Sequence, residues 1–114
     1  MSGGITTHVL DISLGRPAAG VAVTLEMREG GAWRKIGEGK TDGDGRLRTL
    51  VPSGEAIAAG TWRLTFEVGA YFRAAGREAF FPEVAIAFEV RDAAQHYHVP
   101  LLLSPYGYST YRGS

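Results

Sequence analysis

Short segments in which apolar and polar residues alternate dominate this 114-residue chain. Alternation with a period of two places apolar side chains on one face of a β-strand and polar side chains on the other. In the segment 21–27, for example, Val21, Val23 and Leu25 alternate with smaller or polar residues. The pattern predicts seven strands and a further strand in the tail after Ser104-Pro105; the seven segments are 7–12, 21–27, 33–40, 46–50, 62–68, 84–90 and 96–103.

Turn-forming residues separate these segments, as at Gly15-Arg16-Pro17, Gly30-Gly31 and 42–45. Only the segment 69–76 predicts a helix, of about two turns, which Gly76 would end. Eight short strands with frequent turns are typical of an all-β sandwich of two sheets. At this length we expect one domain, spanning residues 1–114.

Composition and charge exclude several classes of function. The 12 basic and 12 acidic residues balance, and no basic stripe is visible, so nucleic acid and an acidic membrane are not expected partners. The chain has no cysteine, which excludes a disulfide framework and a thiolate metal site. It has no apolar run long enough to cross a bilayer, and Met1-Ser2-Gly3-Gly4 shows no secretory signal. We therefore expect a soluble, cytoplasmic protein.

Histidine is scarce, and its three copies fall in two strands: His8 in the first, and His96 and His98 in the seventh. Alternation puts His8 on the face opposite Val9, and His98 on the face opposite the apolar set that makes the better core. Apolar residues that would normally avoid water share these outward faces: Leu10 beside His8, and Pro100 and Leu102 beside His98. No metal-binding spacing, carboxylate cluster or nucleophile motif accompanies them, so no metal site is predicted.

The tail carries an unusual density of recognition residues. It contains three tyrosines, Tyr106, Tyr108 and Tyr111, and Arg112 follows the last of them. Terminal segments usually carry small polar residues and fray. An arginine offers a rigid fork of donors for a planar, oxygen-rich partner. We interpret the tail as part of a site.

Five ordered segments of the chain resemble the transthyretin-like proteins. They are 7–11, 15–18, 41–46, 70–72 and 102–106. The last four residues, Tyr111-Arg112-Gly113-Ser114, are similar to the signature of the enzymatic branch of that family, the 5-hydroxyisourate hydrolases. The resemblance covers nearly the whole chain, and the closing tetrapeptide is its most specific part.

The resemblance implies a fold, an assembly and a site. Each subunit would be a sandwich of two four-stranded sheets, and four subunits would form a homotetramer with sites where two dimers meet. His8, Arg46 and His98 would be catalytic. Substrate would be bound by residues of the tail and of the adjoining face: Tyr111, Arg112, Ser114, Leu10, Pro100 and Leu102. No cofactor is implied, and His96 matches no motif of the family and is interpreted as structural.

The chemistry of 5-hydroxyisourate fits such a site. Ring opening requires water to attack a polarised ring carbonyl, and a histidine can act as general base and then return the proton to the leaving nitrogen. Arg46 and Arg112 could hold the carbonyl edge and stabilise the developing negative charge. His8 and His98 are assigned jointly to the base and its orienting partner, because the sequence does not distinguish them.

Two other classes of function compete with this one. A carrier of small ligands could use the same tetramer, but it would favour a more apolar channel and would not need histidines facing arginines. A structural or adhesion β-sandwich would leave all these residues as solvated surface.

Overall fold

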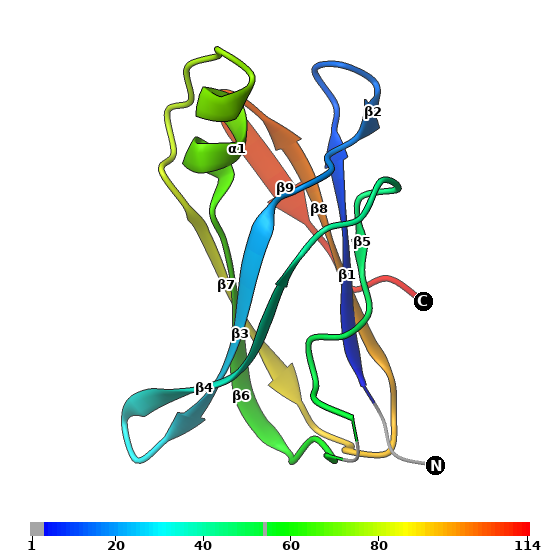
Figure 1. Cartoon of the computed structure of the whole chain (residues 1–114). Helices are drawn as coiled ribbons and strands as arrows, with labels where there is room; N and C mark the ends of the chain where they lie inside the picture. Colours follow the sequence, from blue (N-terminus) through cyan, green and yellow to red (C-terminus); the bar gives the residue numbers. More distant parts are fainter. Residues whose placement is uncertain (1–3, 54) are drawn as a thin grey trace.

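A computed structural model describes residues 4–53 and 55–114 as a two-layered β-sandwich (Figure 1). Of the segment Met1 to Gly4, in which no leader was expected, only Gly4 is described. The described residues form one helix, α1 (Val68–Ala74), and nine strands: β1 (Ile5–Asp11), β2 (Arg16–Pro17), β3 (Ala22–Glu29), β4 (Ala32–Lys40), β5 (Arg46–Leu47), β6 (Gly60–Phe66), β7 (Val84–Val90), β8 (Tyr97–Ser104) and β9 (Gly107–Thr110).

The two sheets have different hydrogen-bonding patterns. One sheet has the order β4-β3-β6-β7, and all of its neighbours are antiparallel. The other has the order β2-β1-β8-β9, and β5 also pairs with β1. In this second sheet β1 and β8 run parallel, so segments about 90 residues apart in the sequence lie side by side. His8 lies in β1 and His98 in β8, and His96 immediately precedes β8.

The predicted all-β sandwich is confirmed, with one added element. The segment 15–17, expected as a turn alone, contains β2, because Arg16 and Pro17 pair with Asp11 and Leu10. The strand expected over 46–50 is only the two residues of β5, and the helix begins at Val68 rather than 69. Gly76 follows the helix with φ of 70°, a conformation that favours glycine.

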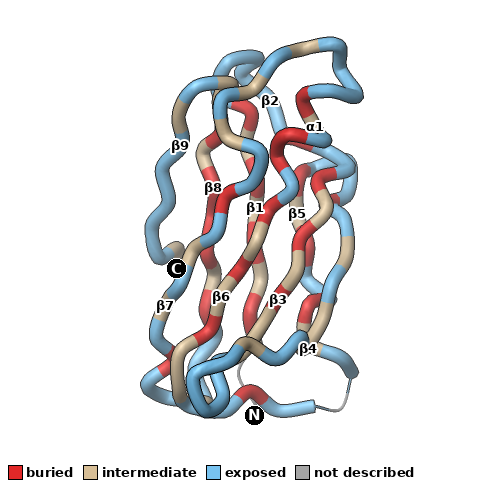
Figure 2. The backbone as a smooth tube through the Cα atoms, turned by 90° about the vertical axis from the view of Figure 1, so that its left-hand side faces the viewer, coloured by how far each residue is buried: buried red, intermediate tan, exposed pale blue. Residues whose placement is uncertain are grey.

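Alternating burial along the strands confirms that one face of each sheet makes the core. In β1, Ile5, Thr7, Val9 and Asp11 are buried, whereas the residues between them are half-buried (Figure 2). In β8 the buried set includes Tyr97, Val99, Leu101 and Leu103, as expected. No helix of the described residues is long and apolar enough to cross a membrane.

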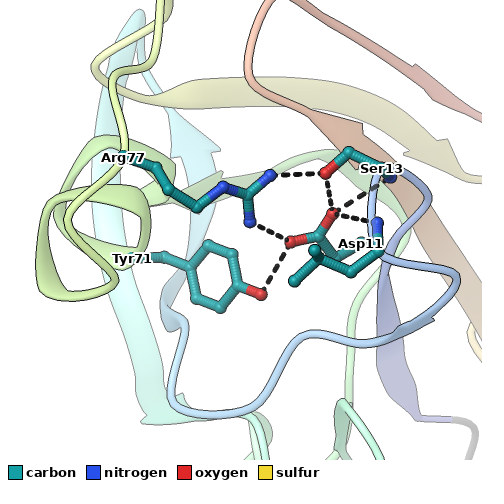
Figure 3. A network of polar contacts seen from close by, with 5 residues as sticks. Asp11, Ser13, Tyr71 and Arg77 are labelled. Atoms are coloured by element: carbon teal, nitrogen blue, oxygen red, sulfur yellow. Dashed lines mark hydrogen bonds and ion pairs between the residues drawn. The ribbon is translucent and has the colours of Figure 1, made fainter.

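Among the described residues, Asp11 is the one buried carboxylate, and it lies on the inward face of β1. It links α1 to the end of this strand (Figure 3). Its Oδ2 accepts hydrogen bonds from the Tyr71 hydroxyl at 2.9 Å and from Arg77 Nη1 at 3.0 Å, and its Oδ1 accepts one from the Ser13 hydroxyl. Burial alone would raise the pKa of Asp11, but these three donors together outweigh it and lower the pKa. Burial and the hydrogen bond to Asp11 raise the pKa of Tyr71 to about 12.

Candidate functional site

The outward face of the sheet that contains β1, β5 and β8 brings several of the predicted site residues together. In the strand register, His8 lies opposite Arg46 of β5 and opposite Pro100 of β8. His98 precedes Pro100 by two residues and lies opposite Thr6. Residues two apart in a strand share a face, and directly paired residues are close neighbours. His8, Arg46 and His98 therefore form one group on this face.

A tight loop, 41–45, sets the positions of Arg46 and His8. The Asp42 carboxylate accepts hydrogen bonds from the backbone N–H groups of Arg46 and Asp44, both at 2.9 Å. The first of these bonds is the main cause that lowers the pKa of Asp42. The Asp44 carbonyl oxygen lies 2.9 Å from His8 Nε2. The loop thus holds the start of β5 and the His8 ring together.

Gly45 allows this loop to approach β1. Its φ is 76°, and a Cβ at this position would lie 2.3 Å from the carbonyl oxygen of Val9. The Val9 N–H also donates to the Gly45 carbonyl at 2.7 Å. Glycine is needed here both for its backbone conformation and for the close contact.

The partner of His8 fixes which of its ring nitrogens carries hydrogen. A carbonyl oxygen only accepts hydrogen bonds, so His8 Nε2 must donate to Asp44. In the neutral ring Nδ1 is then the bare nitrogen.

His98 is held differently. Its Nδ1 lies 2.8 Å from the hydroxyl of Thr6, and its Nε2 makes no hydrogen bond to the residues that the structure describes. Burial is the main cause that lowers the pKa of His98, followed by the positive charge of Arg46 and the neighbouring His8. The lowered pKa favours the neutral form of His98 at pH 7, and its Nε2 is free to contact a bound molecule.

The end of the chain returns to His98. β9 pairs with β8, and Thr110 lies opposite Leu101. The backbone pairing of the tail with β8 is interrupted beside Pro100, which has no N–H to donate. It resumes at Gly113, whose N–H donates to the His98 carbonyl at 2.8 Å. A Cβ on Gly113 would lie 2.7 Å from Cδ2 of the His98 ring, so the tail lies directly against the imidazole.

A cavity of about 320 Å³ opens on this face between the polar groups. Two guanidinium groups, two imidazoles, two threonines and the end of the tail line it: Arg46, Arg48, His96, His98, Thr6, Thr7 and Ser114. The cavity combines fixed positive charge, a neutral imidazole and hydroxyl groups. Such a set can bind a small anion or an oxygen-rich ring and can transfer a proton.

Arg112 and Tyr111 lie outside this cavity. They line a second hollow of about 230 Å³, toward β7. The Arg112 guanidinium lies 4.5 Å from the centre of the Tyr97 ring and donates to Gln95 Oε1 at 3.1 Å. Successive residues of an extended chain point to opposite sides, so Arg112 faces away from the side on which Gly113 contacts His98. Within one subunit the structure does not bring Arg112 to Arg46.

The three predicted apolar residues follow the two central strands of this sheet. Leu10 and Leu102 are paired across β1 and β8 and are half-buried, and Pro100 is buried beside Gly113. They continue the face that carries His8 and His98.

Sequence reasoning missed four residues of this site. Thr6, Thr7 and Arg48 were not assigned to it, and His96 was interpreted as structural, yet all four line the cavity. The available signal was position, because Thr6 and His96 each precede a predicted site histidine by two residues and so share its face.

The structure has a larger hollow, of about 540 Å³, beside α1. It has no histidine in its lining, and one of its two arginines, Arg77, is already bonded to Asp11. Within the described residues no group of histidine and acidic side chains could hold a metal ion. The cavity beside His98 is the better candidate for chemistry.

Residues 5–113 match the model of the HIUase/Transthyretin family. A 5-hydroxyisourate hydrolase 2 of Rhizobium meliloti is 51% identical over 117 residues, which cover 99% of this chain and 98% of that protein.

Two solved structures show the same fold at different sequence distances. The 5-hydroxyisourate hydrolase of Klebsiella pneumoniae superimposes with a TM-score of 0.86 and is 42% identical, covering 98% of this chain and 99% of its own. Sea bream transthyretin in complex with thyroxine superimposes with a TM-score of 0.89 but is only 29% identical, covering 96% and 94%. By sequence the chain is more similar to the two hydrolases than to this transthyretin.

Proposed function

The chain belongs to the HIUase/Transthyretin family, and we propose that it hydrolyses 5-hydroxyisourate with the groups that surround His98. It is a hydrolase, and its product is 2-oxo-4-hydroxy-4-carboxy-5-ureidoimidazoline, an intermediate of urate breakdown. The residue assignment is supported by one observation: Arg46, His98 and Ser114 line the same cavity, and His8 is paired with Arg46.

Arg46 binds and polarises the substrate. Its guanidinium presents several N–H donors to the carbonyl edge of a planar ring, and it stabilises the negative charge that develops on the carbonyl oxygen during attack. Ser114 and the half-buried Leu10 and Leu102 complete the surroundings, the first with a polar contact and the others with apolar surface.

His98 is the general base in this mechanism. Its Nε2 accepts a proton from water as the water oxygen forms a bond to the ring carbonyl carbon. When the tetrahedral intermediate breaks its carbon–nitrogen bond, the same imidazolium returns the proton to the departing ring nitrogen. His8 orients the substrate or the water through Nδ1, because its Nε2 is bonded to the Asp44 carbonyl.

We further propose that the working unit is a homotetramer of single-domain subunits, residues 1–114, in which Tyr111 and Arg112 reach substrate across a contact between dimers. Several large apolar or aromatic side chains are exposed in one subunit: Ile12, Leu14, Phe80, Tyr106, Tyr108 and Tyr111. Contiguous exposed apolar surface, rather than scattered residues, usually marks a contact with another chain, and Phe80 and Tyr106 of this set line one hollow beside α1. We propose the cytoplasm as the compartment.

A carrier function is less well supported by the cavity. A carrier needs apolar surface and shape, whereas this cavity presents two guanidinium groups and a neutral imidazole. The structural module is disfavoured, because it does not account for the low pKa of His98 or for the contact of the tail with its ring.

The assay is the decay of ultraviolet absorbance of freshly generated 5-hydroxyisourate with purified protein. We expect the wild type to exceed the spontaneous rate, and His98→Ala to lose about 10²–10⁴-fold in kcat, which is the usual contribution of a general base. Since His98 is half-buried and lies off the core face, the variant should keep its fold by circular dichroism.

Glu38→Gln, at an exposed position of β4 in the other sheet, is the control and should keep the wild-type rate. A wild-type rate equal to the spontaneous rate would refute the activity. Full activity in His98→Ala would leave the activity standing and refute the assignment of the base.

A further inference from the structure

Thr6 connects two neighbouring histidines, His98 on the outward face of β8 and His96 just before this strand. The Thr6 hydroxyl oxygen lies 2.8 Å from His98 Nδ1 and 2.9 Å from His96 Nε2. The parallel register of β1 and β8 places Thr6 directly opposite His98, and His96 precedes His98 by two residues. The reaction described above assigns no role to Thr6 or to His96.

The hydrogens of these three groups allow three arrangements, because a hydroxyl has one hydrogen to donate and two lone pairs. If Thr6 donates to His98 Nδ1, then His96 Nε2 carries hydrogen. If Thr6 donates to His96 Nε2, then His98 Nδ1 carries hydrogen. If Thr6 accepts from both nitrogens, its own hydrogen has no acceptor among the described residues, which disfavours that arrangement.

Of the two arrangements in which Thr6 donates to a ring, only the second leaves His98 able to act as a base at Nε2. A neutral imidazole carries one N–H, so hydrogen on Nδ1 leaves Nε2 bare. Hydrogen on Nε2 would remove its lone pair from use and prevent it from accepting a proton from water. The direction of the Thr6 hydroxyl therefore decides whether the ring can take part in the reaction.

We propose that Thr6 and His96 are positioning residues that hold His98 in its Nδ1–H tautomer. His96 Nε2 accepts the Thr6 hydroxyl hydrogen, and the Thr6 oxygen accepts the hydrogen of His98 Nδ1. This inference rests on the proposed hydrolase function, and it adds two residues that never need to touch the substrate.

The surroundings of His98 leave this role to Thr6. Arg46, Arg48, His8 and His96 are the charged or titratable groups that act on the His98 ring, and none of these four is hydrogen-bonded to its Nδ1. The two arginines disfavour the imidazolium, and they do not distinguish the two neutral tautomers by a hydrogen bond. His8 needs no side chain to fix its tautomer, because the Asp44 backbone carbonyl already accepts a hydrogen bond from its Nε2–H.

The test compares two substitutions of Thr6 in the full chain. Thr6→Val keeps the shape and removes the hydroxyl, and we expect it to lower kcat by about tenfold to a hundredfold, the usual effect of losing a residue that orients a catalytic group. KM should change much less, because substrate contacts remain. Thr6→Ser restores the hydroxyl and should recover most of the rate, and His96→Phe should lower kcat in the same direction but by less.

Thr65→Val is the matched control, since Thr65 is a half-buried strand threonine of the other sheet. It should leave kcat unchanged. Circular dichroism and solution mass establish that each variant keeps its fold and assembly.

A second readout follows the tautomer itself. Ring 15N shifts of histidine, in protein labelled only at histidine, separate a protonated nitrogen from a bare one. We expect hydrogen on Nδ1 of His98 in the wild type at pH 7, and its partial transfer to Nε2 in Thr6→Val. His98→Ala identifies the signals.

Two results would overturn the proposal while the wild type remains an active hydrolase: full kcat in Thr6→Val, or a wild-type His98 ring with hydrogen on Nε2. An inactive wild type would instead refute the proposed function. The two failures are thus distinguishable.

Discussion

Gly113 decides whether the tail can lie against the imidazole of His98. Its backbone N–H bonds to the His98 carbonyl, and the position of its missing side chain is already occupied by ring atoms. Its φ is not positive, so the backbone itself would accept any residue. The demand for glycine here comes from the neighbouring ring and from Pro100, whose Cγ lies 3.3 Å from the same point.

Gly113→Ala should therefore reduce activity while leaving stability nearly unchanged. The new methyl group must displace either the His98 ring or the tail, and a misplacement of about 1 Å in an active site can cost about a hundredfold in rate. We expect kcat/KM to fall by about tenfold to a hundredfold. The free energy of unfolding should change by no more than about 0.5 kcal/mol, as for most surface substitutions.

Gly107→Ala is the control for this variant. Gly107 lies in β9, has no positive φ, and a Cβ there would meet only the Ser104 hydroxyl at an ordinary 3.7 Å. It should keep the wild-type rate. Equal rates for Gly113→Ala and Gly107→Ala would show that the contact with His98 is unimportant.

The position of α1 against β1 is fixed in part by one buried carboxylate, that of Asp11. Asp11, at the end of β1, accepts hydrogen bonds from Tyr71 within the helix and from Arg77 just after it (Figure 3). The Asp11 side chain is fully buried, and the side chain of Arg77 is 25% exposed. A buried carboxylate that keeps all its partners is stable only while it is ionised.

Asp11→Asn should lower the free energy of unfolding at pH 7 by about 2–4 kcal/mol, because it leaves Arg77 without its anion. The folded pKa of Asp11 is below 3.8, so its contribution is complete above the unfolded pKa. It is lost as the pH falls from about 5 through the lower, folded pKa. The difference between wild type and variant should therefore shrink in that range, as urea titrations at each pH would measure. A difference that stayed constant from pH 7 to 3 would contradict this account.

At the scale of the whole molecule, the sequence predicted the features that depend only on the alternation of residues within one strand. Alternation with period two placed His8 and His98 outward and Val9 and Leu101 inward, because strand geometry needs no knowledge of the partner strand. It also placed Asp11 on the inward face. It could not show that Tyr71 and Arg77, 60 and 66 residues away, would neutralise the cost of burying that carboxylate.

The features that alternation missed depend on register between distant strands. Thr6 contacts His98 across 92 residues of sequence, and the contact exists only for one offset of β1 against β8. The direction of Arg112 depends likewise on the offset of the tail against β8, which Pro100 interrupts. The resemblance to a family supplied the candidates for the site residues, but not their hydrogen-bond partners.

The proposed assembly makes a prediction for the whole particle. If sites are completed between dimers, the solution mass should be four times the 12.2 kDa of one chain. Dilution that dissociates this particle should lower the specific activity in proportion, because Arg112 would lose access to the shared site. Sedimentation and activity measured over the same concentrations would check this. A fully active monomer would refute the shared site.

The parallel pairing of β1 with β8 also has a consequence for how the protein is made. The first strand cannot find its main partner until the ribosome has synthesised everything up to residue 104. Contacts between such distant segments are slow to form, and unpaired strand edges stay open to aggregation meanwhile. We therefore expect the groups of the proposed site to come together only after the chain is complete, so that activity appears after release from the ribosome and assembly of the subunits.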